Sequence, residues 1–190
     1  MRTTITLLFL CTLLGLTACS TRQLQDSLIG STAQRLVTHS IDDLMKQLPE
    51  SDFETMRGRS VYVESHFVED SRLKDYADER LALELRRRFG AQLVNNPEEA
   101  ERVVNVFYTS LATDQSDFGI SIPLGFVPGV NETAKINILT LQKFHGISEF
   151  YYFAGESGTE TRSKTYQAVV RTDALGLPLI TIPISNVDRD

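Results

Sequence analysis

The stretch RVVNVFYTSLAT, residues 102–113, decides the fold, because it is the clearest long strand in the sequence. Its apolar side chains follow the two-residue period of a strand. One face carries Val104, Val106 and Tyr108, and the other carries Val103, Phe107 and Leu111. Since both faces are apolar, we expect this strand to be a central one in its sheet.

A second strand is expected upstream, at residues 59–68. Its apolar set is Val61, Val63 and Phe67, and these alternate with Tyr62, Glu64 and His66. This alternation is typical of a strand that buries one face, so the second set should point away from the first.

A helix is expected between these two strands. Asp70 or Ser71 can cap it, and it runs to about Phe89. Apolar residues recur at four-residue spacing at Leu73, Ala77, Leu81, Leu85 and Phe89. Gly90 then supplies a left-handed stop, and residues 91–94 follow as a short strand.

The segment NPEEAERVV, residues 96–104, leads from that short strand into the central one. Together with the order of elements around it, this segment resembles the start of a known α/β fold. That fold occurs in the amino-terminal domain of TolB and in outer-membrane lipoproteins of the curli-secretion and exopolysaccharide-export kind. The matching positions are Pro97, Glu98, Ala100, Val103 and Val104. The resemblance covers roughly residues 59–111 and implies an assembly, secretion or scaffold component, not an enzyme. The chain departs from this pattern after Asp114.

The remaining elements complete the expected fold. A helix is predicted over residues 31–48, where apolar residues recur at helical spacing and Pro49 ends the run. Further strands or hairpin arms are predicted at residues 134–143, 146–154, 163–172 and 177–184. We therefore expect a single α/β (α+β) domain with a mixed or antiparallel sheet and the long helices packed on one face.

An apolar segment, FGISIPLGFVPGV at residues 118–130, is the most unusual part of this domain. Its glycines and prolines argue against a regular helix and against a continuous strand. The candidate contact residues are Phe118, Ile120, Ile122, Leu124, Phe126 and Val127. Two interpretations stay open: a flap folded over its own sheet, and a contact with a subunit, a partner or a membrane.

The run Phe150-Tyr151-Tyr152-Phe153 is a second candidate contact, because alternation places aromatic rings on both faces of its strand. Packing in the core and at the sheet edge explains this run, while the enrichment of tyrosine at interfaces leaves a contact role open.

The amino terminus has the parts of a secretory signal peptide: a positive start at Arg2, an apolar stretch and small residues before a cut. The apolar run is shorter than the about 20 residues that a spanning helix needs. Its end, Leu16-Thr17-Ala18-Cys19, resembles the lipobox of bacterial lipoproteins. The resemblance implies cleavage between Ala18 and Cys19, a diacylglyceryl group on the Cys19 sulfur and acylation of the new amino terminus.

We therefore expect a signal peptide at residues 1–18, a lipidated tether at 19–30 and a periplasmic domain at 31–190. The alternative, an uncleaved amino-terminal anchor, also places the domain outside the cytoplasm. Ser20 follows the cysteine, whereas an aspartate there commonly signals inner-membrane retention in Gram-negative lipoproteins. The expected location is the periplasmic side of the outer membrane, with the lipid on Cys19 as the attachment.

Composition excludes several classes of function. The formal net charge of −6 leaves no electrostatic footprint for nucleic acid and no basic cluster for anionic lipid. Both cysteines are consumed, since Cys11 leaves with the signal peptide and Cys19 carries lipid. The mature domain then has no thiol for catalysis, for a disulfide or for a metal site.

The search for catalytic motifs returns one weak candidate. Glu64 and His66 share a strand face, which permits a carboxylate–histidine pair near Glu69 and Asp70. No nucleophile elbow, zinc-protease motif, phosphate loop or calcium loop is present.

These observations favour a non-enzymatic binding, assembly or scaffold module of the bacterial envelope, with no cofactor or metal. A second copy of the chain or another envelope protein is the expected partner, through residues 118–130 or the open sheet face. The alternative is an envelope ligand-binding protein or hydrolase that uses the Glu64 and His66 face.

Overall fold

A computed structural model gives the fold and describes residues 21–25, 30–68, 71–129, 135–178 and 180–185, the first range by its backbone alone. The predicted signal peptide and lipidation site, Ala18 and Cys19 included, lie outside the described residues. Contacts divide the chain into two compact units. Unit 1 comprises residues 1–25, 114–144 and 172–190, and unit 2 comprises residues 26–113 and 145–171.

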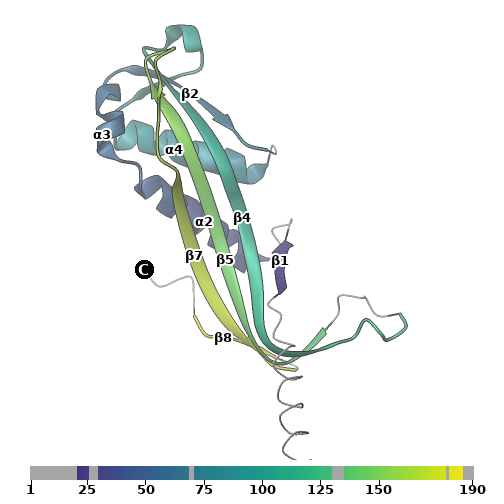
Figure 1. Cartoon of the computed structure of the whole chain (residues 1–190). Coiled ribbons are helices and arrows are strands. Elements are labelled where there is room, and N and C mark those ends of the chain that lie inside the picture. The colour runs from purple at the N-terminus through teal and green to yellow at the C-terminus, as the bar shows by residue number, and fades with distance from the viewer. Residues whose placement is uncertain (1–20, 26–29, 69–70, 130–134, 179, 186–190) are drawn as a thin grey trace, which may run out of the picture. The chain divides into compact units, whose positions relative to one another are not determined.

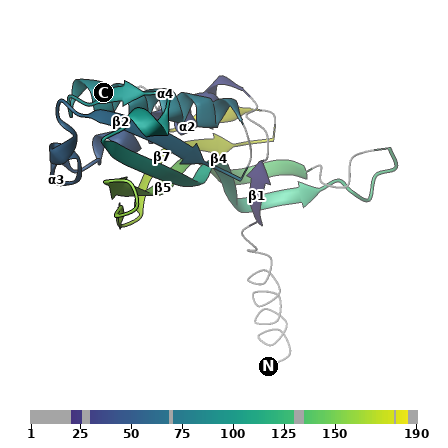
Figure 2. The same ribbon diagram turned by 90° about the horizontal axis from the view of Figure 1, so that it is seen from above.

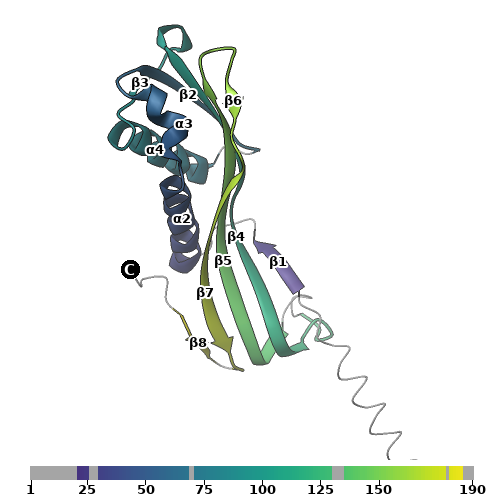
Figure 3. The same ribbon diagram turned by 60° about the vertical axis from the view of Figure 1, so that its left-hand side comes forward.

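The described strands form one sheet in the order β3-β2-β4-β5-β7-β8, with β1 paired to β4 and β6 paired to β5 (Figures 1 and 3). They are β1 (Thr21–Gln25), β2 (Ser60–His66), β3 (Gln92–Val94), β4 (Arg102–Pro123), β5 (Lys135–Gly155), β6 (Thr161–Arg162), β7 (Tyr166–Gly176) and β8 (Thr181–Pro183). The helices are α2 (Ser31–Lys46), α3 (Glu50–Phe53) and α4 (Arg72–Arg87), and 3₁₀ turns span Glu54–Met56 and Pro97–Glu99. Parallel and antiparallel pairs both occur, so the predicted α/β class with a mixed sheet is confirmed.

In unit 2, β2 lies between β3 and β4 and runs parallel to both, with Tyr62 opposite Val94 on one side and Val103 on the other. Helices α2 and α4 lie on the same face of this part of the sheet (Figure 3). The core is built from residues of both helices and of the strands, among them Val37, Ile41, Leu44, Leu81, Leu85, Val61, Val104, Val106, Tyr108, Phe150 and Tyr152. The strand side chains that alternate with these core positions point to the opposite face of the sheet, called here the open face.

The helix boundaries lie within two residues of the predicted ones, since α2 ends at Lys46 and not at Leu48, and α4 ends at Arg87 and not at Phe89. Ser71 caps α4, since its hydroxyl accepts a hydrogen bond from the Lys74 amide. Gly90, with a φ of 69°, follows the end of α4 as expected. Helix α2 ends at Lys46, and Pro49 precedes the short helix α3.

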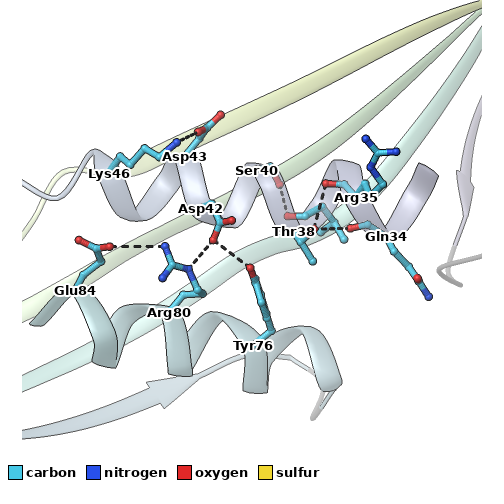
Figure 4. Close-up of polar contacts among 11 residues, drawn as sticks. Gln34, Arg35, Thr38, Ser40, Asp42, Asp43, Lys46, Tyr76, Arg80 and Glu84 are labelled. Atoms are coloured by element: carbon cyan, nitrogen blue, oxygen red, sulfur yellow. Dashed lines mark hydrogen bonds and ion pairs between the residues drawn. The ribbon is translucent and has the colours of Figure 1, made fainter. Parts of the chain in front are cut away.

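A polar contact joins α2 to α4 (Figure 4). The Asp42 carboxylate accepts hydrogen bonds from Arg80 Nε at 2.6 Å and from the Tyr76 hydroxyl at 3.1 Å. Burial, followed by the negative charge of Asp42, raises the pKa of Tyr76, and the hydrogen bond to Asp42 raises the pKa of Arg80. The two helices are thus tied by a charge-assisted pair beside their apolar contact.

Unit 1 contains residues 114–123 of β4, 135–144 of β5 and 172–176 of β7, together with β1 and β8. The predicted boundary between a strand ending at Thr113 and an irregular segment starting at Phe118 is wrong, because β4 continues to Pro123. The predicted strands at 134–143 and 146–154 are likewise one strand, β5.

Gly119 explains why β4 continues through a residue expected to interrupt it. Its φ is 146°, and a Cβ at this position would overlap the carbonyl oxygen of Leu139 on β5. The glycine therefore lets the two backbones approach closely, which a residue with a side chain would prevent. An ion pair between Lys135 and Asp117 joins the same two strands nearby.

Candidate interaction surface

Exposed apolar side chains gather in unit 1. Among the described residues, every strongly exposed large apolar side chain except Val68 and Val169 belongs to this unit. The set, called here the apolar surface of unit 1, comprises Phe118, Ile120, Ile122, Phe126, Val127, Ile136, Ile138, Leu139, Ile180, Ile182 and Ile184. It is drawn from β4, β5, β8 and the segments that flank them.

Five of the six predicted contact residues belong to this surface. The exposed fraction is 62% for Phe118, 66% for Ile120 and 75% for Phe126. Ile122 and Val127 are also exposed, whereas Leu124 is half-buried. The exposure favours the contact interpretation over a flap folded on its own sheet.

Strand geometry places part of this surface on one side of β4. Phe118, Ile120 and Ile122 are two residues apart, so their side chains leave the same face of the strand. Beyond Pro123 the chain turns, and the Val127 amide donates a hydrogen bond to the Leu124 carbonyl at 2.9 Å. Figure 2 shows this segment extending away from the strands of unit 1.

The open face of the sheet in unit 2 carries a second feature, a stack of four flat groups. The Arg162 guanidinium lies 4.5 Å from the ring centre of Tyr151, which stacks on Phe107 at 5.2 Å. Phe107 stacks on His66 at 4.6 Å. These four residues, the aromatic stack, come from β6, β5, β4 and β2, and each ring in the stack is only half-buried.

The aromatic run of β5 divides between the two faces, as its alternation predicted. Phe150 and Tyr152 are buried in the core of unit 2. Tyr151 and Phe153 contact each other and Phe107 on the open face. The Tyr152 hydroxyl donates a hydrogen bond to Asp52 at 2.6 Å, and burial, followed by this bond, raises the pKa of Tyr152 far above its usual value.

Glu64 and His66 leave the same face of β2, where the His66 ring stacks on Phe107 and Glu64 is exposed. Glu69 and Asp70, the other members of the predicted cluster, lie outside the described residues. Within the described part of the chain, no three His, Cys, Asp or Glu side chains gather in a metal-binding arrangement. None of the described helices has the length and apolar character needed to cross a membrane.

The sequence could not reveal the aromatic stack as a unit. Phe107 was identified as an apolar residue and His66 as a polar one, and Arg162 was not singled out. The stack depends on the register that sets His66 opposite Phe107 and Arg162 opposite Phe153.

A comparison with models of known protein families finds no match, and a search among curated proteins also finds none.

Proposed function

We propose that this protein is a lipid-anchored, non-enzymatic interaction module at the periplasmic face of the outer membrane. The observation that carries the proposal is the apolar surface of unit 1, which includes five of the six contact residues expected from the sequence. The lipobox at residues 16–19 supports the anchor and the location.

Exposure of this surface to water costs free energy. Groups of exposed apolar side chains gathered in one part of a protein are typical of interaction sites. Each aromatic or aliphatic side chain removed from water contributes about 1.5–3 kcal/mol. A surface built from Phe118, Ile120, Phe126 and their neighbours thus favours a bound state in the envelope.

Single-thiol labelling tests this proposal. Both native cysteines lie within the first 19 residues, so the mature chain offers no competing thiol once Cys19 is lipidated. In a Phe126→Cys variant, the new thiol should react severalfold more slowly with a membrane-impermeant maleimide in osmotically opened envelopes than after unfolding in urea.

The matched control is Val68→Cys, since Val68 is 89% exposed and lies in unit 2. Its thiol should label rapidly in the same envelopes. If the Phe126→Cys thiol labels as fast as this control, nothing covers the surface and the proposal fails.

The aromatic stack favours a second candidate, a ligand-binding protein of the envelope that uses the open sheet face. The stack of half-buried rings ends at the exposed side chain of Arg162, so a ligand would meet both apolar ring surface and a cationic group. Native mass spectrometry of the protein purified from envelopes should then show a small molecule of fixed mass, lost in His66→Ala and retained in Thr109→Ala. A wild-type protein that carries no such molecule would remove this candidate.

A further inference from the structure

The point of lipid attachment indicates what covers the apolar surface of unit 1. Under the proposed function, the acyl chains are on Cys19, two residues before Thr21, where β1 begins. Because consecutive Cα atoms are 3.8 Å apart, the Cα atoms of Cys19 and Thr21 are separated by at most about 7.6 Å. The membrane surface therefore lies close to β1.

Strand β1 connects this attachment point to the apolar surface. It pairs with β4 and belongs to unit 1, as do Phe118, Ile120 and Ile122 at the end of β4. Figures 1 and 3 both show β1 beside the part of β4 that leads to Pro123. A bilayer that holds the acyl chains is thus within reach of the same unit that exposes the apolar side chains.

The chemistry of the segment suits a lipid surface. Residues 118–129 contain no Asp, Glu, Lys or Arg, so no charge needs to be moved out of water. Interfacial amphipathic helices bury their apolar face about 5–10 Å into the boundary between headgroups and acyl chains, and we take the same depth for this segment. Backbone polar groups at that depth need partners, and pairing of β4 with β5 and the turn at Leu124 and Val127 supply several of them.

We propose that the apolar surface of unit 1 docks on the bilayer that holds the Cys19 lipid, with Phe118, Ile120 and Phe126 in its interfacial layer. The proposal rests on the proposed lipid anchor. Burial of apolar area, not attraction to anionic lipid, drives the docking, because the chain is acidic and Lys135 is already paired with Asp117. The acyl chains alone keep the protein on the membrane, so the docking changes the position of unit 1 and not the attachment.

The test must therefore measure contact with acyl chains. The chain contains no tryptophan, so Phe126→Trp creates a single fluorescent reporter. The full, lipidated variant is reconstituted into phosphatidylcholine vesicles with and without bromine atoms on the acyl chains, which quench tryptophan on contact. The matched control is Val68→Trp in the same vesicles, and Phe118→Trp provides a second reporter.

We expect the Phe126→Trp and Phe118→Trp emission to shift to the blue on reconstitution and to lose most of its intensity in brominated vesicles. The Val68→Trp emission should stay that of a solvent-exposed indole. Unquenched reporters at 118 and 126 would overturn lipid docking. If the Phe126→Cys thiol is nevertheless protected in envelopes, a protein covers the surface, so the interaction module stands while the lipid partner does not.

Discussion

The Cα hydrogens of Gly146, on β5, lie against the main chain of α2. A Cβ at this position would overlap the carbonyl oxygen of Leu36 and crowd the Val37 amide nitrogen. Neither atom is at the end of a flexible side chain, so the helix itself would have to move. The close approach of α2 to β5 at this point thus requires a residue without a side chain.

Gly146→Ala should lower the free energy of unfolding by about 1–3 kcal/mol, the usual cost of overpacking a well-filled interior. Urea unfolding followed by circular dichroism measures this loss. Ser157→Ala, in an exposed turn of the same unit, is the control and should stay within about 0.5 kcal/mol of wild type. Equal urea midpoints for the two variants would show that α2 moves to accommodate the added methyl group with no loss of stability.

At the scale of elements, much of unit 2 was predictable from residues 31–111. The helices were predicted by the helical spacing of apolar residues and by the end signals at Ser71 and Gly90. Two-residue alternation predicted β2 and the first part of β4. These predictions succeed because the local patterns agree with the tertiary structure. The lengths of β4 and β5 were not predictable. In the sequence alone, Gly119 indicates the end of a strand. Its place within β4 is explained only by the close approach of the Leu139 backbone on β5, which is 20 residues away in the sequence.

The candidate sites also differ in how far they could be predicted from the sequence. The apolar residues 118–127 were predicted individually, because an uncharged segment with so many large side chains is visible in the sequence alone. Ile180, Ile182 and Ile184 were not, since they read as an ordinary irregular strand. The aromatic stack depends on pairing between strands, which no single segment contains.

At the scale of the whole molecule, two different surfaces fall on two different units. Unit 1 carries the apolar surface, and unit 2 carries the aromatic stack on the face opposite its core. That core also holds tyrosines whose hydroxyls are shielded from water, which makes its stability sensitive to alkali.

Stability of unit 2 should fall as the pH rises through about 10, the ordinary pKa of tyrosine. The pKa values of Tyr76, Tyr108 and Tyr152 are raised in the folded chain, so above pH 10 the unfolded chain releases protons that the folded chain retains. The unfolded state then binds fewer protons, and the free energy of unfolding decreases with pH.

Urea unfolding between about pH 8 and about pH 11 measures this slope. Tyr152→Phe removes one of the three groups and should give a shallower decrease than wild type. An unchanged slope in this variant would mean that Tyr152 ionises equally in both states.

Strand β8 is the last in the sheet order, and its backbone limits how unit 1 can associate. The Ile184 amide donates a hydrogen bond to the Asp173 carbonyl, and the Ile180 carbonyl accepts one from the Leu177 amide. The backbone groups of the even-numbered residues therefore point toward β7, and those of Pro183 point to the open edge of the sheet. Proline has no amide hydrogen to offer a further strand. A further chain that paired along β8 would therefore lose one backbone hydrogen bond at Pro183, which weakens edge pairing, the usual hazard of an apolar strand at a sheet border.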